Sequence, residues 1–318
     1  MKLREMILRL AAASGPSGFE GSAQAVAEEI LRPLVDEVRT DVMGNLIGLR
    51  RAGRDDAPTV MLDAHMDEIG LIVTGYEKGF LRFSTIGGVD ARMLPALEVK
   101  ILTEEPMYGV IDVGLDEETV KTAVPLGTPV VFSVPVTELG EYQICGKSLD
   151  DRSCAAILLK VMEKLRDRKL PVNVAVCLAA QEEVGCRGAV TAAYSIQPEA
   201  AIAVDVTHGH TPDAAKHKTV KMNGGPAIGI GPNMSRSVSD RLMALCRREE
   251  IPFQPEVCPG HSGTDAWPIQ ISREGVATGL VSLPLKYMHT PVEVLDIRDA
   301  KAIVELIVAW LETYGEED

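Results

Sequence analysis

The segment on which the predicted fold rests is Thr59-Val60-Met61-Leu62-Asp63-Ala64-His65-Met66-Asp67. In it, a short apolar run leads directly into an imidazole and a carboxylate. A run of this kind predicts a buried β-strand over residues 59–64. Three further predicted strands place polar groups in the same way: 172–180 leads into Gln181-Glu182-Glu183, 200–206 ends in Asp205-Val206, and 276–283 precedes Tyr287-Met288-His289. Acidic or imidazole side chains therefore stand at the ends of four predicted strands.

Predicted helices alternate with these strands. Apolar residues at a period of 3.6 predict amphipathic helices, and the segments are 3–13, 20–34, 151–166, 187–195, 238–249 and 297–313. Asp296 is a suitable N-cap for the last of them. The alternation predicts an α/β fold with a mixed, mostly parallel central sheet flanked by helices.

The pattern changes between residues 70 and 145. Here short Val, Ile, Phe and Leu runs, such as 79–83 and 129–134, are broken by glycine and proline, which is typical of short strands in an all-β unit. We therefore expect a β-rich insertion at 70–145 within a discontinuous main domain formed by 1–69 and 146–318.

Composition excludes several classes of partner. The 318 residues carry a formal net charge of −14, which disfavours nucleic acid and anionic membranes because both attract Lys/Arg surfaces. The N-terminal residues 1–10 interleave charged and apolar residues, unlike a signal peptide. The six cysteines form no Cys-x-x-Cys pair. We expect a cytoplasmic protein with reduced thiols.

The polar groups at the strand ends should meet in space. In open α/β sheets, ligands bind outside the carboxyl ends of the strands, so we expect His65, Glu183, Asp205 and His289 to converge there. Asp150, at the start of a predicted helix, is the fifth candidate. Imidazole and carboxylate groups together are typical ligands of divalent metal ions.

Each group also has an ordinary interpretation when it is taken alone. A histidine after a strand is usually a loop residue with its hydrogen bonds satisfied, and Glu182 and Glu183 fit a solvated loop. Asp150 and Asp151 fit a helix start, where carboxylates cap the helix and offset its dipole. The recurrence of five suitable groups at one edge of the sheet favours the metal centre.

Charge balance favours two cations over one. Two divalent cations carry about +4, which Asp150, Glu183, Asp205 and a bridging hydroxide would neutralise if both histidines were neutral. A bridging carboxylate usually holds such ions ~3.5–4 Å apart, and Asp150 is our candidate for the bridge.

Two neighbouring carboxylates have predicted supporting roles. Asp67, two residues after His65, is placed to accept the other imidazole N–H of that ligand and so to fix its tautomer. Glu182, beside Glu183, is the candidate general base.

Six motifs carry a family resemblance: Ser14-Gly15-Pro16-Ser17-Gly18-Phe19-Glu20, Ala64-His65-Met66-Asp67-Glu68-Ile69-Gly70, Lys147-Ser148-Leu149-Asp150-Asp151-Arg152, Gln181-Glu182-Glu183-Val184-Gly185, Gly263-Thr264-Asp265-Ala266 and His289-Thr290-Pro291-Val292-Glu293. In order and spacing, over nearly the whole chain, they resemble the tetrahedral (TET-type) aminopeptidases. That family includes glutamyl and leucyl aminopeptidases, and its members are often labelled cellulases or endoglucanases.

The resemblance implies a site and an assembly. It implies that His65 and Asp205 hold one metal ion, that Glu183 and His289 hold the other, and that Asp150 bridges them. It implies zinc or cobalt as the two divalent ions, short peptides as substrates, and a homo-oligomer that is a dimer or a hollow dodecamer of dimers. Glu182 would be the base, and the β-rich insertion would contribute to oligomerisation.

The chain departs from the family pattern at three places. The insertion is compact, which affects the contacts expected of it in a dodecamer. Cys186 stands where an aliphatic residue is usual, and His261 lies in a loop that is commonly rich in glycine. His208, His210 and His217 are close in sequence, but their polar context favours a loop over a metal site.

Three other functions compete with the aminopeptidase. One is a two-metal amidase or deacylase, and another is a non-catalytic assembly protein that keeps the metal ions for stability. The third is a glucanase, which needs two carboxyl groups flanking a sugar. A content of only 4% aromatic residues offers few surfaces on which a sugar can stack.

Overall fold

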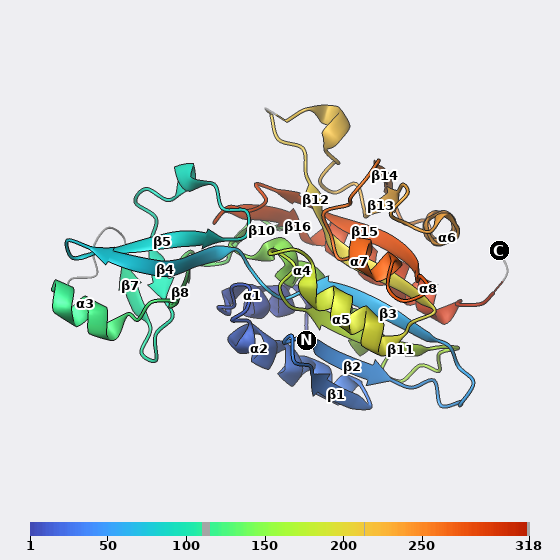
Figure 1. Ribbon diagram of the computed structural model, residues 1–318. Helices are drawn as coiled ribbons and strands as arrows, with labels where there is room; N and C mark the ends of the chain where they lie inside the picture. The colour runs from blue at the N-terminus through green and yellow to red at the C-terminus, as the bar shows by residue number, and fades with distance from the viewer. Residues whose placement is uncertain (110–114, 213, 317–318) are drawn as a thin grey trace.

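A computed structural model describes residues 1–109, 115–212 and 214–316 and divides them between two sheets (Figure 1). Within these residues the larger sheet has 11 strands. Its spatial order is β1 (Glu37–Thr40), β2 (Leu46–Arg50), β11 (Asn173–Ala179), β3 (Thr59–His65), β12 (Ala200–His208), β15 (Ala277–Lys286), β16 (Glu293–Asp296), β10 (Gln143–Gly146) and β9 (Thr137–Leu139), while β13 (Ala227–Ile230) pairs with β15 and with β14 (Gln254–Val257). The predicted α/β class with a mixed sheet is confirmed.

The centre of the large sheet is parallel. Strand β3 runs parallel to β11 and β12, and β12 runs parallel to β15. The register places His65 beside Ala179, the last residue of β11, and Asp205 beside Ser282. The carboxyl ends of these strands therefore lie at one edge of the sheet, where ligands bind in folds of this kind.

Helices cover both faces of this sheet. The helices are α1 (Leu3–Ala12), α2 (Gly21–Leu31), α4 (Leu149–Leu165), α5 (Arg187–Ile196), α6 (Arg236–Arg248), α7 (Ala266–Gln270) and α8 (Ile297–Glu312), with 3₁₀ turns η1 (Arg32–Leu34) and η3 (Lys216–Lys218). Alternate residues of β3 point to opposite faces: Val60 and Leu62 pack in the cluster with α1, α2, α4 and α8, whereas Met61 packs with α5 and α7. Both faces of the central strands are thus buried.

The smaller sheet projects to one side of the large one (Figure 1). Its order is β5 (Phe80–Ile86), β4 (Gly70–Glu77), β8 (Pro129–Phe132), β6 (Val99–Ile101) and β7 (Met107–Gly109), accompanied by α3 (Glu117–Ala123) and the 3₁₀ turn η2 (Ala91–Met93). Leu71, Val73, Ile101, Val124 and Val130 give it a core of its own.

The sheets suggest a different end for the insertion from the one expected at residue 145. Strand β4 starts at Gly70, as expected, but β9 and β10 pair with the large sheet through β16. This pairing joins residues 143–146 to 293–296 and has no local signature in the sequence. We therefore propose 70–132 as the extent of the smaller unit, which also contains helix α3 and so is not all β.

The observed helices lie close to the predicted ones. Helix α8 begins where expected, and the side chain of Asp296 accepts a hydrogen bond from the backbone N–H of Arg298 at 3.0 Å. The start of α4 is less regular, because Asp150 and Asp151 have non-helical dihedral angles. These two residues form a turn into the helix, and both are buried.

Helix α4 lies in the main core, and we expect Leu158→Ala to destabilise the protein by about 2–5 kcal/mol because the substitution leaves a cavity. The side chain of Leu158 is 0% exposed. Chemical denaturation measures the change. Leu126→Ala is the matched control, because Leu126 is 60% exposed and its loss should cost no more than about 0.5 kcal/mol. Equal effects of the two substitutions would contradict this description of the core.

Candidate active site

The five candidate ligands come together at the carboxyl edge of the large sheet. His65 ends β3, Asp205 lies in β12, Glu183 follows β11, His289 follows β15, and Asp150 opens α4. His65, Asp150 and Asp205 offer ligand atoms within 4.8 Å of one another, and so do Asp150, Glu183 and His289. Asp150 belongs to both groups, which is the position that a bridging ligand occupies.

Asp150 faces an imidazole on each side. Its Oδ1 lies 3.1 Å from Nε2 of His65, and its Oδ2 lies 3.3 Å from Nε2 of His289. The same Nε2 of His289 is 3.3 Å from Oε2 of Glu183. The two carboxylate oxygens of Asp150 thus point into two different groups of ligand atoms.

Asp67 supports both His65 and the loop after β11. Its Oδ1 is 3.3 Å from Nδ1 of His65, in the position expected for a group that fixes the imidazole tautomer. The carboxylate also accepts hydrogen bonds from the backbone N–H groups of Glu182 at 3.0 Å and Glu183 at 3.1 Å, and from the hydroxyl of Ser17 at 2.6 Å. One fully buried side chain therefore orients a candidate ligand and the two glutamates beside it.

Glu293 has a comparable position that the sequence did not reveal. It is 2% exposed, and it accepts hydrogen bonds from the backbone N–H of Asp150 at 3.1 Å and of His289 at 2.9 Å. Glu293 therefore joins the two loops that carry these candidate ligands. In the sequence, the signal for this role is the position of Glu293 at the end of the motif that starts at His289.

The electrostatics of the site favour cation binding. Burial, together with the neighbouring Asp265 and Glu183, raises the pKa of Glu182 to about 8. Burial and the nearby Asp150 likewise raise the pKa of Asp205 well above its usual value. Buried carboxylates this close together cannot all be ionised unless positive charge lies between them. Divalent cations supply such charge, and imidazole and carboxylate groups fit them as ligands.

The neighbouring carboxylates favour the charged form of the histidines, whereas burial favours the neutral form of the carboxylates. Hydrogen bonds that Asp150 and Glu183 accept from its imidazole raise the pKa of His289 to about 11. Burial opposes ionisation of Asp150, yet hydrogen bonds with His289 and His65 lower the pKa of that carboxyl. Metal binding would displace the protons that these carboxylates favour on the imidazoles, because histidine binds a metal ion as the neutral ring.

Comparison with known proteins identifies the family. A sequence model described as M42 glutamyl aminopeptidase matches residues 44–114 and 109–306, which is most of the chain. The chain belongs to the M42 glutamyl aminopeptidase family. The TET-type resemblance is confirmed, and the chain is a metal-dependent aminopeptidase.

Relatives match over nearly full length. The lysyl aminopeptidase of Pyrococcus furiosus is 33% identical over 97% of this chain and 96% of its own length. A solved aminopeptidase from the archaeon Desulfurococcus kamchatkensis, 35% identical, superposes with a TM-score of 0.91 over 98% of this chain and 94% of its own. The TET1 peptidase of Pyrococcus horikoshii, which can assemble into a tetrahedron or a large octahedral shell, is 27% identical with a TM-score of 0.86 over 98% and 99%.

A cavity of about 260 Å³ opens onto the ligand cluster. Besides the five candidate ligands and Glu182, its wall contains Val206, Thr207, His208, Glu256, Ser262, Gly263, Thr264, Leu280, Ser282 and Met288. It is the natural place for the substrate of an M42 enzyme, because the candidate ligands lie in its wall.

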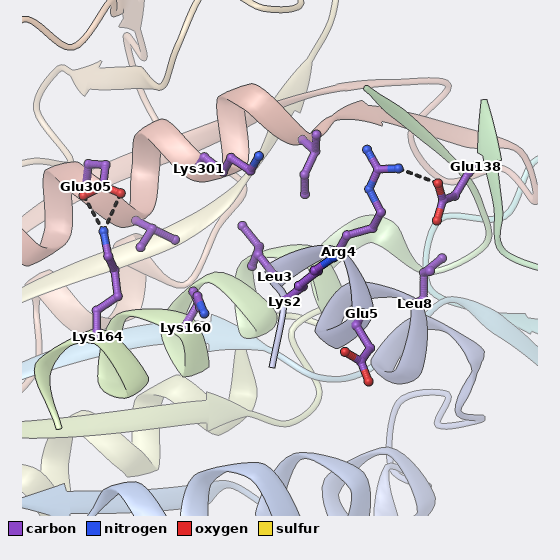
Figure 2. A pocket seen from close by; sticks show the side chains of 12 residues that line it. Lys2, Leu3, Arg4, Glu5, Leu8, Glu138, Lys160, Lys164, Lys301 and Glu305 are labelled. Atoms are coloured by element: carbon purple, nitrogen blue, oxygen red, sulfur yellow. Dashed lines mark hydrogen bonds and ion pairs between the residues drawn. The ribbon is translucent and has the colours of Figure 1, made fainter. Parts of the chain in front are cut away.

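A larger cavity of about 830 Å³ lies elsewhere, between α1, α4 and α8 (Figure 2). Its rim carries Lys and Arg side chains, several of which already form ion pairs, including Arg4 with Glu138 and Lys164 with Glu305 at 2.5 Å. The described residues that line it include no histidine. Although this cavity is the larger of the two, its described lining lacks the imidazole and carboxylate cluster that M42 chemistry needs.

The remaining histidines lie outside the ligand cluster, whereas Cys186 offers a ligand atom in a neighbouring group with Glu182 and Asp265. Among the described residues, His208, His210 and His217 form no group with metal-binding geometry, and Nδ1 of His210 is 3.3 Å from the hydroxyl of Thr219. The ring of His261 stacks on Trp267, with 4.4 Å between centroids. The thiol of Cys186 donates to Oε1 of Glu182 at 3.2 Å.

No helix among the described residues is both long and apolar enough to cross a membrane.

We expect Asp150→Asn to prevent loading of a metal pair, because the amide loses the negative charge and one of the two oxygens that face His65 and His289. Elemental analysis of the dialysed protein measures metal ions per chain. Asp55→Asn, at an exposed loop position, is the control and should load metal as the unaltered protein does. Two metal ions per chain in the Asp150 variant would refute the bridging role.

Proposed function

We propose that this M42 enzyme releases N-terminal residues from short peptides by hydrolysis at two divalent cations. The observation that carries the proposal is the carboxylate of Asp150, which presents one oxygen to His65 and the other to His289. A dinuclear site needs a bridging ligand of this geometry.

The assignment of the ligands follows the two groups of atoms. His65 and Asp205 would hold one ion, Glu183 and His289 the other, with Asp150 between them. We propose zinc or cobalt, since a site of two imidazoles and three carboxylates suits both. When bound, the ions would polarise the scissile carbonyl and lower the pKa of water.

Glu182 is the proposed general base. Its Oε2 lies 3.9 Å from Nε2 of His65, at the edge of the ligand cluster and in the wall of the cavity. Its backbone N–H is fixed by Asp67 and its Oε1 by Cys186. Glu182 would take a proton from the attacking water and deliver it to the leaving amine.

Selectivity for a free N-terminus follows from the charge of the site. A protonated α-amine is attracted by the carboxylates that surround the cavity, and a neutral one can bind a metal ion. An acetylated amine can do neither. A cavity of about 260 Å³ also accepts one residue far more readily than the middle of a folded chain.

We further propose that the chain forms a homo-oligomer, a dimer or a TET-type dodecamer, and that the smaller unit contributes to its contacts. This unit exposes large apolar side chains, among them Phe80 at 56%, Phe83 at 48% and Tyr108 at 58%. Exposed apolar groups of this size are common at protein interfaces. A cytoplasmic location stays a prediction, supported by six cysteines without a disulfide.

The function is tested with aminoacyl-p-nitroanilides, their N-acetylated forms and carboxymethylcellulose, using metal-stripped protein with and without Zn²⁺ or Co²⁺. We expect hydrolysis only of free-amine substrates and only with metal. Turnover of acetylated substrates or of the polysaccharide in place of free-amine substrates would overturn the proposal.

Glu182→Gln should retain both metal ions and lose at least ~10²-fold in kcat, the scale of a general base. Glutamine keeps the size of the side chain but cannot accept the proton. Metal content and kcat are measured on the same preparation. Glu274→Gln, at an exposed position, is the control, and an unchanged kcat in the Glu182 variant would remove this residue from the mechanism.

A further inference from the structure

We propose that Glu256 makes the cavity selective for peptides whose N-terminal residue has a cationic side chain, lysine or arginine. This inference rests on the proposed function and specifies its substrate class. Glu256 lies in β14, outside the ligand cluster, yet its side chain forms part of the cavity wall.

Strand pairing brings Glu256 close to the candidate ligands. Strand β13 lies between β14 and β15, and β15 in turn pairs with β12 so that Ser282 is opposite Asp205. Thr207, two residues after Asp205, points to the same face of the sheet. The carboxylate of Glu256 meets the hydroxyls of Thr207 and Ser282, and it therefore lies over the face of the sheet that carries Asp205.

Two hydroxyl groups hold this carboxylate in place. The hydroxyl of Thr207 donates to Oε1 of Glu256, and the hydroxyl of Ser282 donates to Oε2 at 2.6 Å. Each carboxylate oxygen can accept a further hydrogen bond. The side chain is thus oriented by neutral groups that leave its negative charge uncompensated.

The carboxylates of the cavity wall differ in the roles assigned to them. Of its five carboxylates, Asp150, Glu183 and Asp205 are assigned to metal ions and Glu182 to proton transfer, which leaves Glu256. Among the described residues that form the wall there is no lysine or arginine. His208 is also present, but it is an exposed side chain at the end of β12.

The rest of the wall suits the stem of a long cationic side chain. Leu280 and Met288 are apolar residues of the wall, and Met288 is the more accessible of the two. Lysine and arginine place an alkyl stem on apolar surface and a charged group on a polar partner. An acidic side chain would instead meet a like charge, which disfavours aspartate and glutamate at this position.

The sharpest substrate pair is lysyl- and norleucyl-p-nitroanilide, because norleucine has the alkyl stem of lysine without its ammonium group. We expect kcat/KM to be roughly tenfold or more higher for lysine, the scale of a charge-assisted hydrogen bond. Glu256→Gln should remove most of this preference and change norleucine turnover by less than about threefold. Glu274→Gln is the matched control and should keep the preference.

Two kinetic results would overturn the inference. One is a wild-type enzyme that cleaves norleucine as well as lysine. The other is an equal loss on both substrates in the Glu256 variant, which would place this carboxylate at the α-amine common to both.

Binding separates this inference from the proposed function. In metal-loaded protein carrying Glu182→Gln, calorimetry compares L-lysinamide with L-norleucinamide without turnover. Tighter binding of lysinamide, lost when Glu256→Gln is added, would support the subsite even if no peptide substrate were cleaved. Equal affinities would overturn the subsite while peptide hydrolysis by the wild type would keep the aminopeptidase.

Discussion

The concentration of buried carboxylates at one edge of a parallel sheet is the constraint on which the rest of this molecule depends. Asp150 reaches that edge from α4, Asp205 from β12 and Glu183 from the loop after β11, and each is at least partly removed from water. Ionised groups at this density repel one another and raise one another's pKa. Binding of divalent cations is the arrangement that relieves the repulsion.

Further buried carboxylates in the surrounding structure hold these mutually repelling groups in place. Asp67 and Glu293 each accept two backbone N–H groups from the loops that carry the candidate ligands. Glu68 behind them pairs with Lys147 at 2.7 Å and accepts from the backbone N–H of Gly15 at 2.9 Å. Loops that are far apart in sequence are therefore fixed to one another by charge-assisted hydrogen bonds, which are stronger than neutral ones.

Membership of the M42 family and the preference for a substrate rest on different parts of the structure. The ligand cluster comes from the ends of the central strands and from α4, and it sets the chemistry. The proposed preference comes from Glu256 on a side strand and depends on hydroxyls of β12 and β15. Because the two are separate, the charge of the wall can change without loss of a ligand.

The sequence by itself determined the class of the fold, most helices and strands, and the five candidate ligands. Apolar runs that end in His65 or precede Glu183 and His289 carry this information locally, since strand periodicity and the parallel fold put such ends on one edge. Only the tertiary structure decided which oxygen of Asp150 faces which imidazole, the second role of Asp67 and the place of Glu293. It also placed Glu256 in the cavity and β10 in the large sheet. These features depend on strand register and on pairing between residues more than a hundred positions apart or across three strands, which local sequence patterns do not encode.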